Sequence, residues 1–175
     1  AKPTKKPQSK PVKKPKKANK QSFEPLSDQN IDADEANEQI KSYFSNETLE
    51  KFNSAKWQDK KEGMEEINKA LDSKMEDEIN PLVVIHFLNN KPGFKDTNFN
   101  TNNARFQLVA KLAENWKSKF GVNSIKICLE TLINKLGDLK TNQAASKALY
   151  SIAEHSSTFT WLAKEVLTMA MAQKS

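Results

Sequence analysis

The chain has 175 residues, of which 37% are hydrophobic and 29% are charged, and these proportions suit one domain of ordinary size. Its sequence has no run of about 18 apolar residues that could span a membrane and no apolar signal segment at the N-terminus, so we expect no membrane partner. The single cysteine, Cys128, excludes a disulfide framework within the chain and fits a reducing compartment such as the cytoplasm.

The net charge of +6 is unevenly distributed. Residues 1–20 hold nine of the 28 basic side chains and none of the 22 acidic ones, so the rest of the chain carries a charge of −3. Prolines recur at every fourth position from 3 to 15, and almost nothing apolar is available for burial, so we predict an extended, disordered basic tail. An acidic stretch follows at 24–38, and we interpret residues 1–37 as a linker. The lysines expected to contact acidic surfaces are Lys5, Lys6, Lys13, Lys14, Lys16 and Lys17.

From residue 38 onward, apolar residues recur with the period of an α-helix, and no strand-like alternation persists. The expected stripes are residues 40–44, 49–52, 64–71, 82–88, 106–116, 125–136, 144–152 and 161–171. Asn46 and Asn98 are predicted N-caps, and Asn80-Pro81 is a predicted helix start. Gly137 is the predicted C-cap of the helix that carries the 125–136 stripe.

The helices form pairs that recur along the chain. Asp59, Asp96 and Asp138 occupy the short loops within successive pairs, at spacings of 37 and 42 residues. This period is typical of HEAT-like repeats of about 40–47 residues. We therefore predict an all-α fold, an α-solenoid in which residues 38–175 form about three helix pairs and one further helix. A four-helix bundle is the alternative.

Groups that could carry catalysis do not converge in this sequence. His86 lies in an apolar run, His155 at a helix end and Cys128 in a core-type stripe. One cysteine and two scattered histidines make neither a zinc site nor a catalytic triad, and four scattered glycines make no phosphate-binding loop. We expect no enzymatic activity, no metal and no cofactor, and interpret the chain as a binding protein.

In an α-solenoid, the loops within the pairs lie along one edge, where they form a series of contacts for a partner. The three loops here read NSAKWQDKKEG at 53–63, KPGFKDTNF at 91–99 and KLGDLK at 135–140. Trp57 suits an interface anchor, because an indole gives a large contact area at low entropic cost. From the residues alone, an indole folded back between two helices is equally weighted. Asp96 and Asp138 either cap the following helices or contact a partner.

These loops resemble those of TOG domains, the tubulin-binding HEAT arrays of the ch-TOG / mini spindles family of microtubule polymerases. The first-loop pattern of that family, Trp-x-x-Arg/Lys-Lys/Leu-Glu, is matched by Trp57, Lys60, Lys61 and Glu62. The other two loops and the closing segment WLAKEVLTMAMAQK are similar to the third array of a multi-array member. The resemblance covers residues 38–175 and implies the first part of a longer array, an expectation that fits a chain beginning without Met.

The resemblance implies non-covalent binding of αβ-tubulin and microtubules, with Trp57 inserted against β-tubulin and the basic tail aiding attachment to the lattice. It also implies a cytoplasmic location at microtubule plus ends, the mitotic spindle and the centrosome. The implied tubulin-binding residues are Trp57, Lys60, Lys61, Lys95, Asn98 and Lys140.

Two other functions fit parts of the sequence. The first is a nucleic-acid-binding protein with a basic tail and a helical scaffold. Nucleic acid is disfavoured because the helical part is acidic and Arg105 is the only arginine, whereas bidentate base contacts come mostly from arginine. The second is a generic HEAT adaptor, which predicts that Trp57 is packed away and that the loop edge has no basic ladder.

Overall fold

The computed structural model describes residues 28, 30–155 and 159–172. Within these residues the regular structure is entirely helical, which confirms the predicted all-α, solenoid-like fold. The helices are α1 (Ala33–Tyr43), α2 (Asn46–Asn53), α3 (Trp57–Asp72), α4 (Pro81–Leu88), α5 (Phe99–Asn115), α6 (Val122–Asn134), α7 (Asn142–His155) and α8 (Phe159–Ala172), with 3-10 turns η1 (Gly93–Lys95) and η2 (Lys135–Gly137). The lysines of the predicted basic tail lie outside the described residues.

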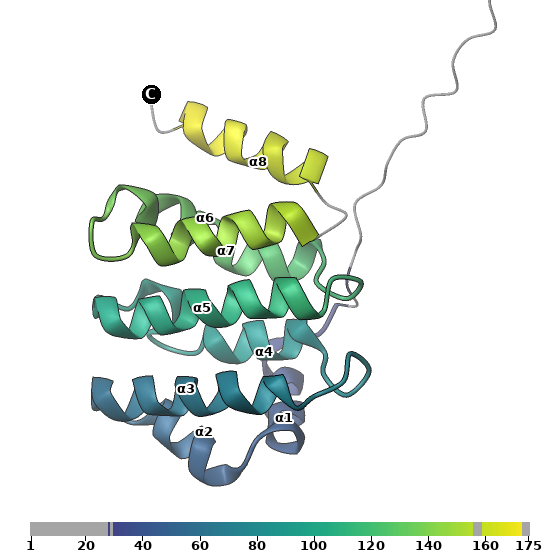
Figure 1. Cartoon of the computed structure of the whole chain (residues 1–175), viewed down its shortest axis with the longest axis vertical. Helices are drawn as coiled ribbons and strands as arrows, with labels where there is room; N and C mark the ends of the chain where they lie inside the picture. Colours follow the sequence, from purple (N-terminus) through teal and green to yellow (C-terminus); the bar gives the residue numbers. More distant parts are fainter. Residues whose placement is uncertain (1–27, 29, 156–158, 173–175) are drawn as a thin grey trace, which may run out of the picture.

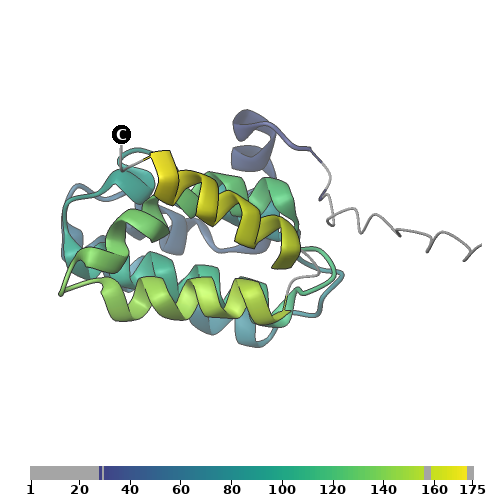
Figure 2. The same ribbon diagram turned by 90° about the horizontal axis from the view of Figure 1, so that it is seen from above.

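The helices form two layers (Figures 1 and 2). α3, α5 and α7 lie side by side in one layer, and α1, α4 and α6 form the second layer. α3, α5 and α7 all run in the same direction, so the loops that precede them lie together at one edge, on the left in Figure 1. The loops that follow α3 and α5 lie at the opposite edge. The predicted arrangement of intra-pair loops is therefore present.

The core lies between the two layers, and the sequence of each helix matches its place there. α4 is almost wholly apolar, and seven of its eight residues are buried between neighbours on several sides. α3 buries one stripe formed by Met64, Ile67 and Leu71. Trp116, the last residue of the predicted 106–116 stripe, is 1% exposed. α8 contacts α7 but buries only Leu162 among its own residues.

The predicted boundary between linker and folded part, after residue 37, is wrong. α1 begins at Ala33, where the carboxylate of Asp32 accepts a hydrogen bond from the backbone N–H of Glu35 (2.8 Å). Asp34 and Glu35 lie in the first turn of the helix, where they complement the partial positive charge of the N-terminus.

Asp28, also assigned to the linker by the sequence, is buried against the start of α6. Its carboxylate accepts hydrogen bonds from the backbone N–H groups of Asn123 (2.7 Å) and Ser124 (2.9 Å). Gly121, the N-cap residue of α6, has no side chain for this task, so Asp28 supplies the cap from a distant part of the chain.

Two predicted helix boundaries are confirmed and two are wrong. Asn80 and Asn98 cap α4 and α5. Ser45, rather than Asn46, accepts the capping bond of α2. α6 ends at Asn134, and Gly137 instead ends a 3-10 turn. No helix in the described residues combines the length and apolar character that crossing a membrane requires.

Candidate binding edge

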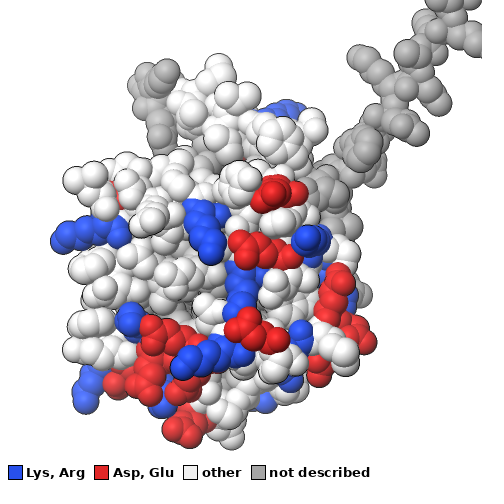
Figure 3. Space-filling model, viewed as in Figure 1, with Lys and Arg blue, Asp and Glu red and all other residues white. Residues whose placement is uncertain are grey.

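The edge formed by the intra-pair loops and the first residues of α3, α5 and α7, here called the binding edge, exposes large apolar side chains. Trp57 and Phe99, the first residues of α3 and α5, are each 39% exposed, and Leu139 in the third loop is 91% exposed. Such groups, set among polar residues, are typical of protein interfaces. Figure 3 shows that acidic and basic side chains are intermingled over α2 and α3 and that few charged side chains lie over α8.

The first loop is fixed by the close approach of α2 and α3. Gly63 of α3 is buried, and a Cβ atom there would lie 2.6 Å from the backbone nitrogen of Phe52. Only glycine therefore permits this helix spacing. Within the loop, the hydroxyl of Ser54 donates to the carboxylate of Asp59 (2.8 Å) and accepts from the backbone N–H of Lys56 (3.2 Å).

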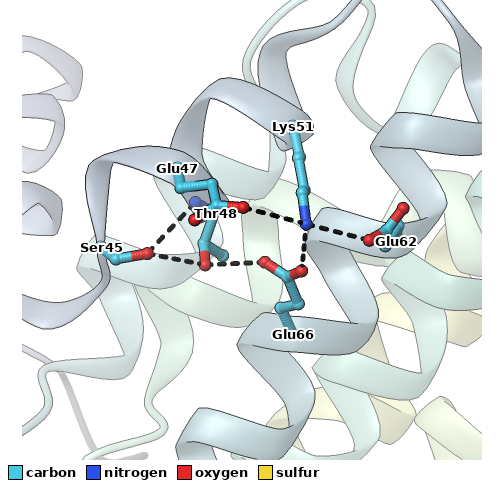
Figure 4. A network of polar contacts seen from close by, with 6 residues as sticks. All are labelled: Ser45, Glu47, Thr48, Lys51, Glu62 and Glu66. Carbon is cyan, nitrogen blue, oxygen red and sulfur yellow. Dashed lines mark hydrogen bonds and ion pairs between the residues drawn. The ribbon is translucent and has the colours of Figure 1, made fainter.

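An ion-pair network centred on Lys51 also joins α2 to α3 (Figure 4). The Lys51 Nζ lies 2.5 Å from a carboxylate oxygen of Glu66, 2.9 Å from Glu62 and 3.5 Å from Glu47. The hydroxyl of Thr48 donates to Glu66 (2.8 Å). The hydrogen bonds to Glu66 and Glu62 raise the pKa of Lys51, and the bonds from Lys51 and Thr48 lower the pKa of Glu66.

The residues of the first-loop pattern therefore have different environments. Trp57 is 39% exposed, so its side chain, whose position the sequence left open, is partly covered by the protein and partly open to solvent. Lys61 is half-buried and pairs with Glu65 one helical turn later (2.7 Å). Glu62 contributes to the Lys51 network. Lys60 is half-buried and has no ion pair within the described part of the chain.

The second loop is held by a buried aromatic residue. Phe94 is 1% exposed, and its ring stacks on that of Phe106 with centroids 6.5 Å apart and planes 4° apart. Gly93, which precedes it, has φ +59°, a conformation that favours glycine. The peptide bond between Lys91 and Pro92 is cis. Lys95 follows Phe94 and is exposed, as its proposed role requires.

Asp96 connects the second loop to the core. Its carboxylate pairs with the Arg105 guanidinium (3.1 Å) and accepts a hydrogen bond from the backbone N–H of Asn98 (3.0 Å). Arg105 is 1% exposed, and its guanidinium lies 6.0 Å from the centre of the Phe52 ring. Burial lowers the pKa of Arg105, and the hydrogen bond to Asp96 opposes this effect. The only arginine of the chain is thus a core residue that supports the binding edge.

Asn98 is half-buried, and its side-chain oxygen accepts hydrogen bonds from the backbone N–H groups of Asn100 (3.0 Å) and Thr101 (3.3 Å). The side chain predicted to meet tubulin is therefore used, at least through its oxygen, to cap α5. Any contact of Asn98 with a partner would have to come from its amide nitrogen.

The third loop places a lysine beside an aromatic ring of the second. The Lys140 Nζ lies 5.0 Å from the centre of the Phe99 ring, a cation–π contact. The backbone carbonyl of Lys140 accepts from the side-chain amide of Asn103 (3.0 Å), and its N–H donates to Asp138 (3.0 Å). This N–H bond, with the ion pair to Lys135, lowers the pKa of Asp138. Lys140 is exposed yet held on several sides.

The structure thus brings the predicted residues of all three loops to one edge, with Trp57, Lys95 and Lys140 exposed on it. Phe99 and Leu139 belong to the same surface and were not predicted. Leu139 could have been found as an apolar residue between charged ones in a short loop. The exposure of Phe99 has no comparable signal, because an aromatic residue after an N-cap often packs inward.

The sequence predicts no catalytic role for Cys128 or His155. Cys128 is buried, and desolvation raises the pKa of its thiol to about 12. The His155 Nε2 lies 3.5 Å from the carboxylate of Glu154. Within the described residues, no group of three or more histidine, cysteine or acidic side chains is placed to hold a metal ion.

Comparison with known proteins finds a distant similarity to a centrosomal protein. No family model matches the chain, and no solved structure matches it significantly. The chain is 26% identical over 112 residues to Centrosomal protein 224 of Dictyostelium discoideum. The match covers 63% of this chain and only 6% of the relative, so the chain corresponds to a small part of that protein.

Proposed function

We propose that this chain is a tubulin- and microtubule-binding module of the TOG type, acting within a microtubule polymerase or plus-end regulator. The observation that carries the proposal is the shared edge on which Trp57, Lys95 and Lys140 are exposed. The first-loop pattern and the distant similarity to a centrosomal protein support it.

The edge would bind without bond chemistry. Trp57 would bury its indole against the partner as an anchor, and the lysines would meet acidic or polar groups around it. The array would favour one curvature of tubulin, concentrate subunits at a growing end and release them as they straighten. A basic tail that contacts the lattice would keep the module close to that end.

The name of the Dictyostelium relative associates that protein with the centrosome. We propose the same location for this chain, together with microtubule plus ends and the mitotic spindle. A cytoplasmic protein that binds tubulin at these sites would need no membrane contact.

Gel filtration with αβ-tubulin tests the proposal. The variant Trp57→Ala/Lys95→Ala should bind about 30-fold more weakly than the wild type, because truncating an aromatic anchor typically costs about 2 kcal/mol. The matched control is Met75→Ala/Lys126→Ala, which removes an exposed apolar side chain and a lysine away from the binding edge. Equal binding by the wild type and the Trp57 variant would refute the proposed interface.

Deletion of residues 1–20 separates this function from nucleic-acid binding. The proposal predicts that tubulin binding through the binding edge survives the deletion and that only the salt-sensitive part of lattice binding is lost. A nucleic-acid-binding protein would instead lose all binding with its basic tail.

A further inference from the structure

A polar groove with a volume of about 470 Å³ lies between α5 and α7, beside the third loop. Its lining combines side-chain amides from both helices with ammonium groups: Asn103, Gln107, Lys140, Asn142, Gln143 and Lys147. Leu139, 91% exposed, also borders it. Five of these six residues, all except Lys140, are absent from the loop patterns that the sequence singled out.

The charge of the groove is positive. Both charged residues that line it are lysines, and neither has an ion pair within the residues that the structure describes. The carboxylate of Asp138, in the same loop as Lys140, pairs with Lys135 and accepts the backbone N–H of Lys140. Its negative charge is therefore already engaged outside the groove lining.

The neutral part of the lining suits a polypeptide backbone. A side-chain amide presents both a donor and an acceptor, as a peptide group does. The amide nitrogen of Asn103 donates to the carbonyl of Lys140, and its side-chain oxygen is buried. The amides open to a ligand are those of Gln107 and Gln143, which are exposed.

We propose that this groove binds an extended acidic peptide segment. Carboxylates of the peptide would pair with Lys140 and Lys147, and its backbone would bond to the amides between them. Lys140 lies in the turn just before α7 and Lys147 lies in the second turn of that helix, so an extended segment lying along α7 would pass both lysines. Leu139 would contact an apolar side chain of the segment. The site does not require the proposed function, because a peptide from any acidic protein would satisfy it.

The experiment measures fluorescence anisotropy of a labelled, glutamate-rich decapeptide with the full chain at low ionic strength. Lys140→Gln/Lys147→Gln should weaken binding about tenfold, the effect of removing two partly exposed ion pairs. The control Lys126→Gln/Lys164→Gln removes the same charge from exposed positions on α6 and α8 and should have little effect.

Two outcomes would overturn the inference. Equal weakening by both double variants would show that only net charge matters, and no weakening by either would place the binding elsewhere in the chain, such as the basic tail. A peptide with glutamine in place of glutamate should not bind measurably. The groove shares Leu139 and Lys140 with the binding edge, whereas Lys147 lies outside that edge. Trp57→Ala should weaken tubulin binding alone and Lys147→Gln should weaken peptide binding alone, so the two proposals can fail independently.

Discussion

The variant Asp96→Asn tests whether the binding edge is supported by a buried ion pair. Asparagine keeps an oxygen that can accept the N–H of Asn98 and has nearly the same shape as aspartate. It removes the negative charge 3.1 Å from the Arg105 guanidinium, whose side chain is 1% exposed. The change therefore leaves a cation buried without its counter-charge.

Breaking a buried pair in this way typically costs about 3–5 kcal/mol. The side chain of Asp96 is 12% exposed, so some water reaches the pair and the lower end, about 3 kcal/mol, is expected. For a domain of this size, such a loss lowers the melting temperature by roughly 6–12 °C.

Urea unfolding followed by circular dichroism measures this loss. The control Glu65→Gln breaks an exposed pair with Lys61 and should cost less than about 0.5 kcal/mol. A double-mutant cycle adds the variant Asp96→Asn/Arg105→Met. Its loss of unfolding free energy should be smaller, by at least about 1 kcal/mol, than the sum of the losses of the two single variants. A loss below about 1 kcal/mol for Asp96→Asn would refute the reasoning, because the pair would then behave like one at the surface.

Three further predictions concern the described helices. Gly63→Ala should lower the melting temperature, because the new Cβ would meet the backbone of α2. This clash should outweigh the preference for alanine in a helix interior, which is about 1 kcal/mol. A higher melting temperature would contradict this. The stabilisation from the Lys51–Glu66 pair should be full above the usual pKa of Glu66, 4.5, and should decline as the pH falls through its lowered value. Between about pH 5 and pH 8 the difference in unfolding free energy between the wild type and Lys51→Met should therefore stay constant, and it should shrink in acid. The raised pKa of Lys51 keeps the pair charged in the folded protein above the ordinary lysine value of 10.5, so the stabilisation is full below that pH and is lost as the pH rises through the raised pKa. Cys128 should react with a disulfide reagent at pH 8 at least about 100-fold more slowly in the folded protein than in urea, because the thiol is buried with a pKa of about 12; similar rates would disprove this.

The sequence predicts the parts of this fold that depend on neighbouring residues. The stripes of α3 and α5, the Asn80-Pro81 start and the Asn98 cap all follow from local spacing and backbone chemistry. It fails where the partner is distant. Asp28 was assigned to a linker because its own neighbours are polar, yet it caps α6 through hydrogen bonds that span 95 and 96 residues.

The candidate site shows the same division. Loop periodicity placed Trp57, Lys95 and Lys140 on one edge, because a regular stack of pairs brings corresponding loops together. The partners of individual side chains could not be predicted in this way. Arg105 was considered only for nucleic-acid contacts, but the ion pair with Asp96 depends on how α5 lies against the second loop.

The binding edge combines exposed contact groups with buried supports. Phe94 stacks in the core immediately before the exposed Lys95, and Asp96 is tied to Arg105 immediately after it. A loop fixed on both sides loses little conformational entropy when its exposed residue meets a partner, so more of the contact energy appears as affinity. Variants of the supports should therefore weaken partner binding even where the protein remains folded. An edge of flexible loops would respond only to changes in the exposed residues themselves.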